Sequence, residues 1–222
     1  MINTKKCSEE EWEAAQNTEF SVWGGFDVGD GDDWSGYWKE NINNYDDIKG
    51  KHFANVIEVG CGPFGKNLTR VIDLITYEKL YALDPLLKNY CANGRSGIFK
   101  ICKNLNIEQL SIPLEDYTSH KNKMDLIICN NVLDHCYDAD ICFKNIYESL
   151  RSGGVLIFGN DLKDESDIAT ARDTMHPIML QEDYLKEKFS SYTTIFEKII
   201  PRKECRNKVH CCGCVFTVLR KK

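Results

Sequence analysis

The chain has 222 residues, of which 42% are hydrophobic, and its formal net charge is −6. This length fits one domain with room for an additional covering segment, and it is enough to bury a sizeable core. The negative charge argues against a broad phosphate-binding surface, so nucleic acid is not an expected partner. No stretch approaches the ~18 apolar residues of a membrane span, and the amino terminus lacks the apolar core of a signal peptide. We therefore expect a cytoplasmic protein that does not bind membranes.

Residues 1–50 form the first of two expected parts, an N-terminal helical segment. Ser8 and Glu11 form the S-x-x-E pattern that opens a helix, and a run rich in glycine and aspartate at 24–33 separates it from a second helix near Trp34–Trp38. The aromatic residues of this part either fold over a bound ligand as a lid, with the glycines as hinges, or pack a helix onto the rest of the protein. The sequence leaves both interpretations open.

Residues 51–222 form the second part, in which short apolar segments alternate with segments of helical length. This alternation is typical of a parallel sheet with crossover helices. Strands are expected at Ala54–Val59, Lys79–Asp84, Ile98–Cys102, Met124–Asn130 and Gly154–Gly159, and helices at Lys66–Thr76, Pro85–Asn93, Ala139–Arg151 and Gln181–Phe189. Tyr192–Ile200 and Cys211–Arg220 follow each other without a helix between them, which predicts an antiparallel hairpin at one end of the sheet.

The most informative segment runs from Val56 to Gly65, where a buried strand passes directly into glycines and then into a helix. Gly60 and Gly62 allow the backbone to turn sharply and to approach a ligand closely. The start of the following helix offers free N–H groups to negative charge. A tight turn without a ligand would carry the same glycines, so the loop needs a second signal.

The second signal is a carboxylate. Asp84 ends the next expected strand, 19 residues after Gly65, near the ~20 at which such a carboxylate accepts hydrogen bonds from ribose hydroxyls. Asp84 before Pro85 could instead begin a turn, but loop and carboxylate together favour a nucleoside ligand. Glu58, two residues before Gly60, would repel a pyrophosphate and attract a cation. S-adenosylmethionine is a cation without phosphate, so these residues favour it over a nicotinamide dinucleotide.

Four landmarks after the first strand appear in a fixed order. They are Glu58–Gly62 with its acidic partner Asp84, Asn106–Leu110, Asp125–His135 and Leu150–Leu156. In this order residues 54–160 resemble the class I S-adenosylmethionine-dependent methyltransferases, although that family often has an aspartate where this chain has Asn106.

The resemblance implies an α/β fold, a doubly wound, mostly parallel seven-stranded sheet of the Rossmann-like methyltransferase type whose last strand inserts antiparallel. It implies S-adenosyl-L-methionine as the cofactor. The cofactor-binding residues that follow from the loop, its acidic partner and the resemblance are Glu58, Gly60, Cys61, Gly62, Asp84, Pro85, Asn106, Ile107 and Asn130.

Candidate catalytic residues follow the fourth expected strand, because the carboxyl ends of parallel strands face the ligand crevice. They include Asn130, Asn131, Asp134 and His135. His135 has an intrinsic pKa suited to removing a proton from a hydroxyl or amine acceptor. His176, in the connection after the fifth strand, is a second candidate. Alternatively, Asp134 and His135 cap the next helix or hydrogen-bond each other, and His176 is a plain loop residue.

Cysteines near the C-terminus raise the question of a zinc site. Cys211, Cys212 and Cys214 fall on an expected strand, where neighbouring side chains point to opposite faces. A buried strand therefore explains them better than zinc ligands together with Cys205 and His210, and we expect no metal. The cysteines inside other apolar segments are expected to be small buried hydrophobes; these are Cys61, Cys102, Cys129 and Cys142.

Taken together, the sequence predicts transfer of a methyl group from S-adenosylmethionine to an oxygen or nitrogen of a small metabolite such as a sugar or an amine. The lack of a strong basic face favours a small acceptor. Asn130–Leu133 stands where enzymes that methylate nucleic-acid amino groups carry an N/D-P-P-Y/F signature, which argues against that branch. The alternatives are an NAD-dependent oxidoreductase, a non-catalytic S-adenosylmethionine-binding regulatory subunit and a protein-methylating enzyme. A homodimer is compatible with the sequence.

Overall fold

A computed structural model of the chain describes residues 5–24, 34–92, 94–163, 174–205 and 212–222. Seven strands form one sheet in the order β3-β2-β1-β4-β5-β7-β6. The strands are β1 (His52–Val59), β2 (Thr76–Leu83), β3 (Glu108–Leu110), β4 (Met124–Asn130), β5 (Leu150–Leu162), β6 (Tyr192–Pro201) and β7 (Gly213–Lys221). The neighbouring strands from β3 to β5 pair in parallel, and β7 is antiparallel to both β5 and β6. The expected doubly wound sheet and its C-terminal hairpin are confirmed.

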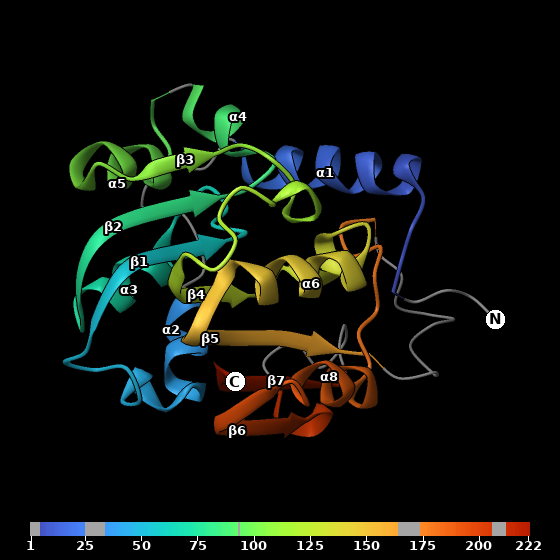
Figure 1. The fold of residues 1–222 in the computed structure, drawn as a ribbon. Helices are drawn as coiled ribbons and strands as arrows, with labels where there is room; N and C mark the ends of the chain where they lie inside the picture. Colours follow the sequence, from blue (N-terminus) through green and yellow to red (C-terminus); the bar gives the residue numbers. More distant parts are fainter. Residues whose placement is uncertain (1–4, 25–33, 93, 164–173, 206–211) are drawn as a thin grey trace.

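Helices cover both faces of this sheet (Figure 1). The helices are α1 (Glu9–Trp23), α2 (Trp34–Asn41), α3 (Lys66–Ile72), α4 (Leu87–Ala92), α5 (Gly97–Leu105), α6 (Ala139–Ser149) and α8 (Glu182–Phe189). Single turns of 3-10 helix lie at η1 (Asn43–Tyr45), η2 (Leu114–Asp116), η3 (Leu133–His135) and η4 (Arg202–Glu204). None of the helices in the described part of the chain is both long enough and apolar enough to cross a membrane.

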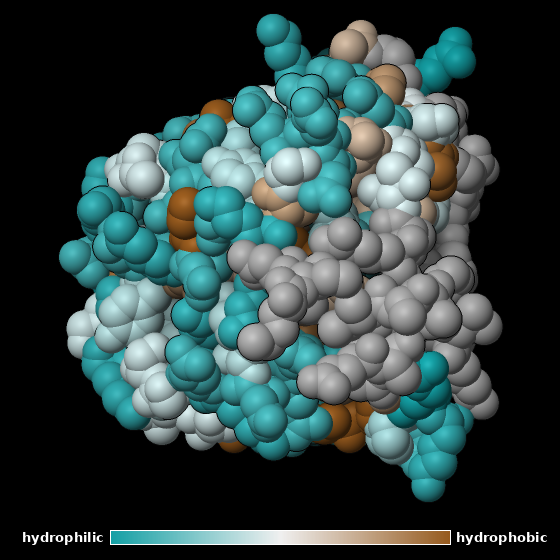
Figure 2. All heavy atoms as spheres, turned by 90° about the vertical axis from the view of Figure 1, so that its right-hand side faces the viewer, coloured by the Kyte–Doolittle hydropathy of each residue, from teal (hydrophilic) through white to brown (hydrophobic). Residues whose placement is uncertain are grey.

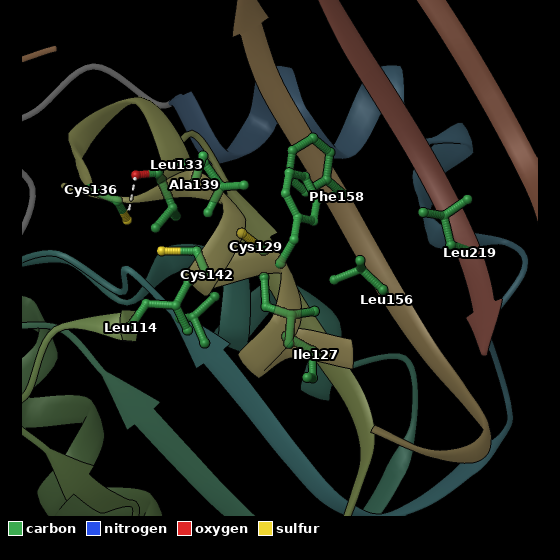
Figure 3. Close-up of a cluster of buried hydrophobic side chains, with 14 of the residues drawn as sticks. Leu114, Ile127, Cys129, Leu133, Cys136, Ala139, Cys142, Leu156, Phe158 and Leu219 are labelled. Carbon is green, nitrogen blue, oxygen red and sulfur yellow. Dashed lines mark hydrogen bonds between the residues drawn. The ribbon is translucent and has the colours of Figure 1, made fainter. Parts of the chain in front are cut away.

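The central strand β4 separates two hydrophobic clusters, and every one of its residues is buried. Its successive side chains point to opposite faces. Ile127 and Cys129 belong to one cluster, together with residues of α6 and α8 (Figure 3). Ile128 belongs to the other cluster, together with residues of α2 and α3. Cys129 and Cys142 of α6 are both buried in the first cluster, so both cysteines behave as small hydrophobes, as predicted.

One strand prediction was wrong. Ile98–Cys102 is not a strand but part of helix α5, which begins after Ser96, whose hydroxyl accepts a hydrogen bond from the Phe99 N–H at 3.3 Å. The third parallel strand is instead the short segment β3. Asn106 and Ile107 therefore precede β3 at its amino end. Asn106 is the exposed, left-handed residue that ends α5, and Ile107 is buried in the core.

Helix α1 begins with the expected reciprocal cap. The Glu11 N–H donates to the Ser8 hydroxyl at 3.2 Å, and the Ser8 N–H donates to the Glu11 carboxylate at 2.9 Å. The preceding chain is fixed to the segment after β4, since the Cys7 N–H donates to the Tyr137 carbonyl at 3.1 Å. The glycine- and aspartate-rich run, which one of the two interpretations made the hinge of a lid, lies outside the described residues except for Gly24.

Candidate functional site

A cavity of about 380 Å³ lies at the carboxyl ends of the parallel strands, within the size range of small-ligand sites. Its walls come from the loops that follow β1, β2, β3, β4 and β5, from α1 and from one side chain of α2. In Figure 1 the parallel strands point toward the side of the molecule from which α1 starts. Figure 2 looks onto that side, where the described surface is mostly hydrophilic with separate hydrophobic spots.

The glycine loop forms the floor of this cavity. Gly60, Gly62 and Gly65 have φ angles of +63°, +56° and +59°, a region that side chains rarely adopt. A Cβ atom on Gly60 would lie 2.4 Å from a γ carbon of Val132, whereas a Cβ atom on Gly62 would meet no protein atom within 4 Å. Gly60, Cys61 and Gly62 all line the cavity. The turn therefore needs glycine at these positions, and at Gly62 it leaves open space.

Glu58 does not line the cavity. Its buried carboxylate accepts hydrogen bonds at 3.0 Å from the Asn67 side-chain amide and from the Leu68 N–H in the first turn of α3. Burial raises the pKa of Glu58 to about 8, although the two donors oppose this rise. We expected Glu58 to attract a cationic ligand directly, but its carboxylate is buried behind the cavity wall and is bonded to α3. Instead, Glu58 occupies a helix N–H group that a pyrophosphate would otherwise use.

Asp84 lies at the cavity wall next to the glycine loop. One carboxylate oxygen accepts from the Gly62 N–H at 2.9 Å, and the other accepts from the Leu86 N–H at 2.8 Å. Burial raises the pKa of Asp84 to about 6, and the two N–H groups oppose this rise. Pro85 lines the same wall. The loop and the carboxylate, identified separately in the sequence, are thus joined by a hydrogen bond.

Asn130 ends β4 and lines the cavity. Its side chain is buried close to the Tyr45 hydroxyl, but neither its amide nitrogen nor its amide oxygen makes a hydrogen bond of normal geometry to a described residue. Leaving a buried polar group unpaired costs about 1–3 kcal/mol. A bound polar ligand would remove this cost, so Asn130 fits the role that the sequence assigned to it.

Asn106 and Ile107 do not line the cavity. Their expected contact with the cofactor depended on a strand ending shortly before them, and that segment is helix α5. The chain that follows β3 contributes Pro113, Leu114 and Glu115 to the cavity wall instead. These residues could not be predicted from the sequence, because β3 has no apolar pattern that would mark it as a strand.

The three predicted catalytic residues come together at the cavity. The Asp134 carboxylate lies 4.0 Å from Nε2 of His135 and 4.0 Å from Nε2 of His176, and the two imidazole rings have centroids 4.4 Å apart. These distances are too long for direct hydrogen bonds. Helix α6 is capped by Asp138, which accepts from the Ile141 N–H at 3.1 Å, so Asp134 is not the helix cap.

Helix α1 supplies a wall that the sequence analysis did not assign residue by residue. Trp12, Gln16, Glu19 and Trp23 line the cavity from this helix. The Gln16 amide donates to the His135 carbonyl at 3.3 Å, and a Glu19 oxygen lies 3.6 Å from Nδ1 of His135. These contacts connect α1 directly to the candidate catalytic residues.

Helix α2, which carries aromatic residues of the N-terminal segment, packs onto the sheet. The Trp38 and Phe216 rings have centroids 5.1 Å apart, and Trp38 also lines the cavity. Of the C-terminal cysteines, Cys205 and Cys214 are buried with their sulfur atoms 3.4 Å apart, while His210 and Cys211 lie outside the described residues.

Residues 57–158 match a protein family described as a methyltransferase domain. The chain therefore carries a methyltransferase domain. The matched residues of this methyltransferase extend from β1 to β5 and include the glycine loop, Asp84 and Asp134. No curated protein sequence matches the chain significantly.

Solved structures share the fold of this methyltransferase at low identity. The N-methyltransferase NodS from Bradyrhizobium japonicum, solved with S-adenosylhomocysteine, is 14% identical with a TM-score of 0.64, over 96% of this chain and 99% of that one. A Burkholderia thailandensis 1,6-didemethyltoxoflavin-N1-methyltransferase is 14% identical with a TM-score of 0.69, over 100% and 93%. The cyclase SpnF is also 14% identical, with a TM-score of 0.60, over 99% and 96%. At this identity the likeness shows the fold.

Proposed function

We propose that this methyltransferase transfers the methyl group of S-adenosylmethionine to an oxygen or nitrogen atom of a small molecule. The observation that carries the proposal is that two groups of residues with different chemistry line one cavity. The glycine loop, Asp84 and Asn130 form the first group, and Asp134, His135 and His176 form the second. We propose that the first group marks the cofactor end of the cavity and the second group marks its acceptor end. The first set suits a nucleoside cofactor and the second suits removal of a proton from an acceptor.

At the cofactor end, Asp84 is the acceptor for the ribose hydroxyls. Its two backbone donors fix the carboxylate in place before a ligand arrives. Asn130 offers an unpaired donor and an unpaired acceptor, and the open space at Gly62 lets a ligand approach the backbone. When bound, S-adenosylmethionine supplies a methyl group that its sulfonium already activates, so the protein needs to align the acceptor and exclude water.

At the acceptor end, the walls favour a small molecule. Helix α1 contributes to the enclosure, and we propose that residues 1–50 form a covering segment over the domain of residues 51–222. Five carboxylates line the cavity, of Glu19, Asp84, Glu115, Asp134 and Asp161, against two lysines, Lys66 and Lys163. This excess of acidic groups supports a cationic cofactor. NodS and the toxoflavin enzyme are N-methyltransferases by name, which supports a small acceptor here.

The two rival functions make different demands. A nicotinamide dinucleotide needs free N–H groups at the helix start after the glycine loop, where Leu68 already donates to Glu58. A non-catalytic subunit would bind the cofactor without turnover, and the position of two histidines beside Asp134 would then have no use.

Calorimetric titration with S-adenosylmethionine, S-adenosylhomocysteine and NAD tests the cofactor. We expect the two sulfur ligands to bind and NAD not to bind. Asp84→Ala should weaken binding by roughly 10- to 150-fold, the equivalent of a charged hydrogen bond of about 1.5–3 kcal/mol. The matched control is Asp73→Ala, which removes an exposed aspartate after α3. Binding of NAD alone would contradict the proposal.

Release of S-adenosylhomocysteine in the presence of small hydroxyl and amine compounds tests the acceptor end. Once an acceptor is found, His135→Ala should lower kcat while the affinity for S-adenosylhomocysteine stays unchanged. His52→Ala is the control, because His52 is exposed at the start of β1. Unchanged turnover in His135→Ala would remove His135 from the reaction.

A further inference from the structure

We propose that Asp134, His135 and His176 bind a divalent first-row transition-metal cation at the acceptor end of the cavity. The chemical role of the cation rests on the proposed function, whereas its binding does not. No metal site could be predicted here from the sequence, because Asp134 and His135 are adjacent while His176 belongs to a different connection of the sheet.

The distances between the three side chains suit a shared cation better than they suit hydrogen bonds. Each side chain offers one ligand atom, and these atoms all lie within 4.8 Å of one another. Nε2 of His135 lies 4.0 Å from Oδ1 of Asp134, and Nε2 of His176 lies 4.0 Å from Oδ2 of the same carboxylate. Metal bonds of about 2.0–2.2 Å to nitrogen and oxygen bring two ligands of one cation to roughly 3–4 Å apart. A cation among these atoms therefore needs only a small contraction of the group.

The Asp134 carboxylate provides independent support. Asp134 is 3% exposed, and its Oδ1 atom is buried without a hydrogen-bond partner in the part of the chain that the structure describes. A buried carboxylate oxygen without a partner is costly, and a cation bound to it would remove the cost.

The second ring nitrogen of His135 faces another carboxylate. Nδ1 lies 3.6 Å from Oε2 of Glu19, while Nε2 faces Asp134. Histidines that bind metals commonly direct their other ring nitrogen toward a carboxylate, which fixes the tautomer and the ring orientation. Oε2 of Glu19 is also buried without a hydrogen-bond partner among the described residues. Glu19 is therefore a positioning residue for His135.

Two imidazoles and one carboxylate suit a cation such as Mn²⁺, Fe²⁺, Co²⁺ or Zn²⁺ and leave coordination positions open. A hydroxyl of the acceptor would bind there through oxygen, and the cation would lower the pKa of that hydroxyl. In this arrangement His135 and His176 hold the cation and do not accept the proton themselves. The hydroxyl proton leaves to water, and an oxygen electron pair forms the bond to the methyl carbon. The carbon–sulfur bond breaks, and its electrons remain on sulfur in S-adenosylhomocysteine. The site thus names the acceptor class, a small hydroxyl compound.

A second group of metal-binding side chains in the described chain serves as a control. Glu115, Cys136 and Cys142 also bring ligand atoms within 4.8 Å of one another, in the core between η2, η3 and α6 (Figure 3). However, Oε1 of Glu115 already accepts from the N–H groups of Tyr137 and Asp138, at 2.6 and 3.0 Å. Two thiols also select softer cations than Mn²⁺.

Titration of the full chain with Mn²⁺, followed by the electron paramagnetic resonance signal of free Mn²⁺, tests the proposal. The titration is done with S-adenosylhomocysteine present. Wild-type protein should bind one Mn²⁺ per chain. Asp134→Asn and His176→Ala each remove a ligand and should weaken Mn²⁺ binding by at least about tenfold. Glu19→Gln removes only the positioning carboxylate and should weaken Mn²⁺ binding by roughly tenfold without abolishing it. His52→Ala, which removes an exposed histidine 3.5 Å from Glu78, and Cys142→Ser should bind as wild type does.

Calorimetry with S-adenosylhomocysteine alone shows whether each variant is folded and whether the cofactor assignment holds. Retained cofactor binding with lost Mn²⁺ binding in Asp134→Asn and His176→Ala supports the site. If the wild type binds S-adenosylhomocysteine but does not bind Mn²⁺, the metal site is overturned and the proposed function stays intact. Equal Mn²⁺ affinity in the wild type, Asp134→Asn and His176→Ala also overturns it. Mn²⁺ binding without cofactor binding would instead contradict the proposed function and support the metal site.

Discussion

The glycine loop permits a comparison of the same substitution at two positions. Gly60→Ala and Gly62→Ala both place a methyl group on a backbone with positive φ, at +63° and +56°. This conformation costs roughly 1–2 kcal/mol for a residue with a side chain. At Gly60 the added carbon would also lie 2.4 and 2.8 Å from the two γ carbons of Val132. Overpacking of this kind costs about 1–3 kcal/mol. We therefore expect Gly60→Ala to lower the free energy of unfolding by about 2–5 kcal/mol and Gly62→Ala by about 1–2 kcal/mol.

Urea unfolding measures these losses, and calorimetry with S-adenosylhomocysteine measures binding. Gly62→Ala should mainly weaken binding, because its methyl group enters space that no protein atom fills. Gly60→Ala combined with Val132→Ala should lose less stability than the sum of the two single variants, since the clash disappears. If Gly60→Ala costs no more than Gly62→Ala, the contact with Val132 does not limit the loop. If Gly62→Ala leaves binding unchanged, the cofactor does not approach Gly62.

Three further predictions concern protonation and the first helix. The affinity for S-adenosylhomocysteine should fall as the pH falls through about 6, because a protonated Asp84 accepts ribose hydrogen bonds poorly, and calorimetry should show no such fall in Asp84→Asn. Glu58 has a pKa of about 8 in the folded chain, compared with an ordinary value of 4.5 in the unfolded chain. Its contribution to the free energy of unfolding is therefore fully present below pH 4.5 and is lost as the pH rises from about 4.5 to about 8. Urea unfolding of Glu58→Gln should show a weaker decline over that range. Ser8→Ala should destabilise α1 by about 0.5–2 kcal/mol, seen as faster amide hydrogen exchange at Glu11 and Trp12; unchanged exchange would contradict the cap.

The sheet could be predicted because its central strands are buried on both faces. Met124–Asn130 contains the continuous apolar run Leu126–Cys129, and β4 has the predicted bounds. The carboxyl-end rule for parallel sheets then predicted that residues after β1, β2 and β4 would meet. Gly62, Asp84 and Asn130 do line one cavity.

The error at Ile98–Cys102 shows where the pattern is ambiguous. A short apolar segment can be a strand or one face of a helix. Ile98, Ile101 and Leu105 recur at helical spacing after Ser96, a residue that commonly caps helices, and this spacing identifies α5. The true strand β3 has exposed side chains and little apolar character, so only its pairing with β2 defines it.

The acceptor end depended on contacts between distant segments. The sequence named His135 and His176 separately, but their proximity requires the chain after β5 to return to η3, where the Ile178 N–H donates to the Asp134 carbonyl at 3.2 Å. The contribution of Glu19 was missed because α1 has a weak apolar side, with Ala15 as its buried residue.

The contacts of α1 also constrain the order of folding during synthesis. This helix is synthesised before the strands of the sheet, yet its ring partners are Phe64, Tyr90 and Tyr137. Gln16 bonds to a residue 119 positions later. With so little apolar surface of its own, α1 has no stable packing partner until the chain through η3 has emerged. Docking of α1 therefore follows the synthesis of β1 to β4, and it adds a wall to the cavity. Removal of this helix would open the cavity without removing a strand.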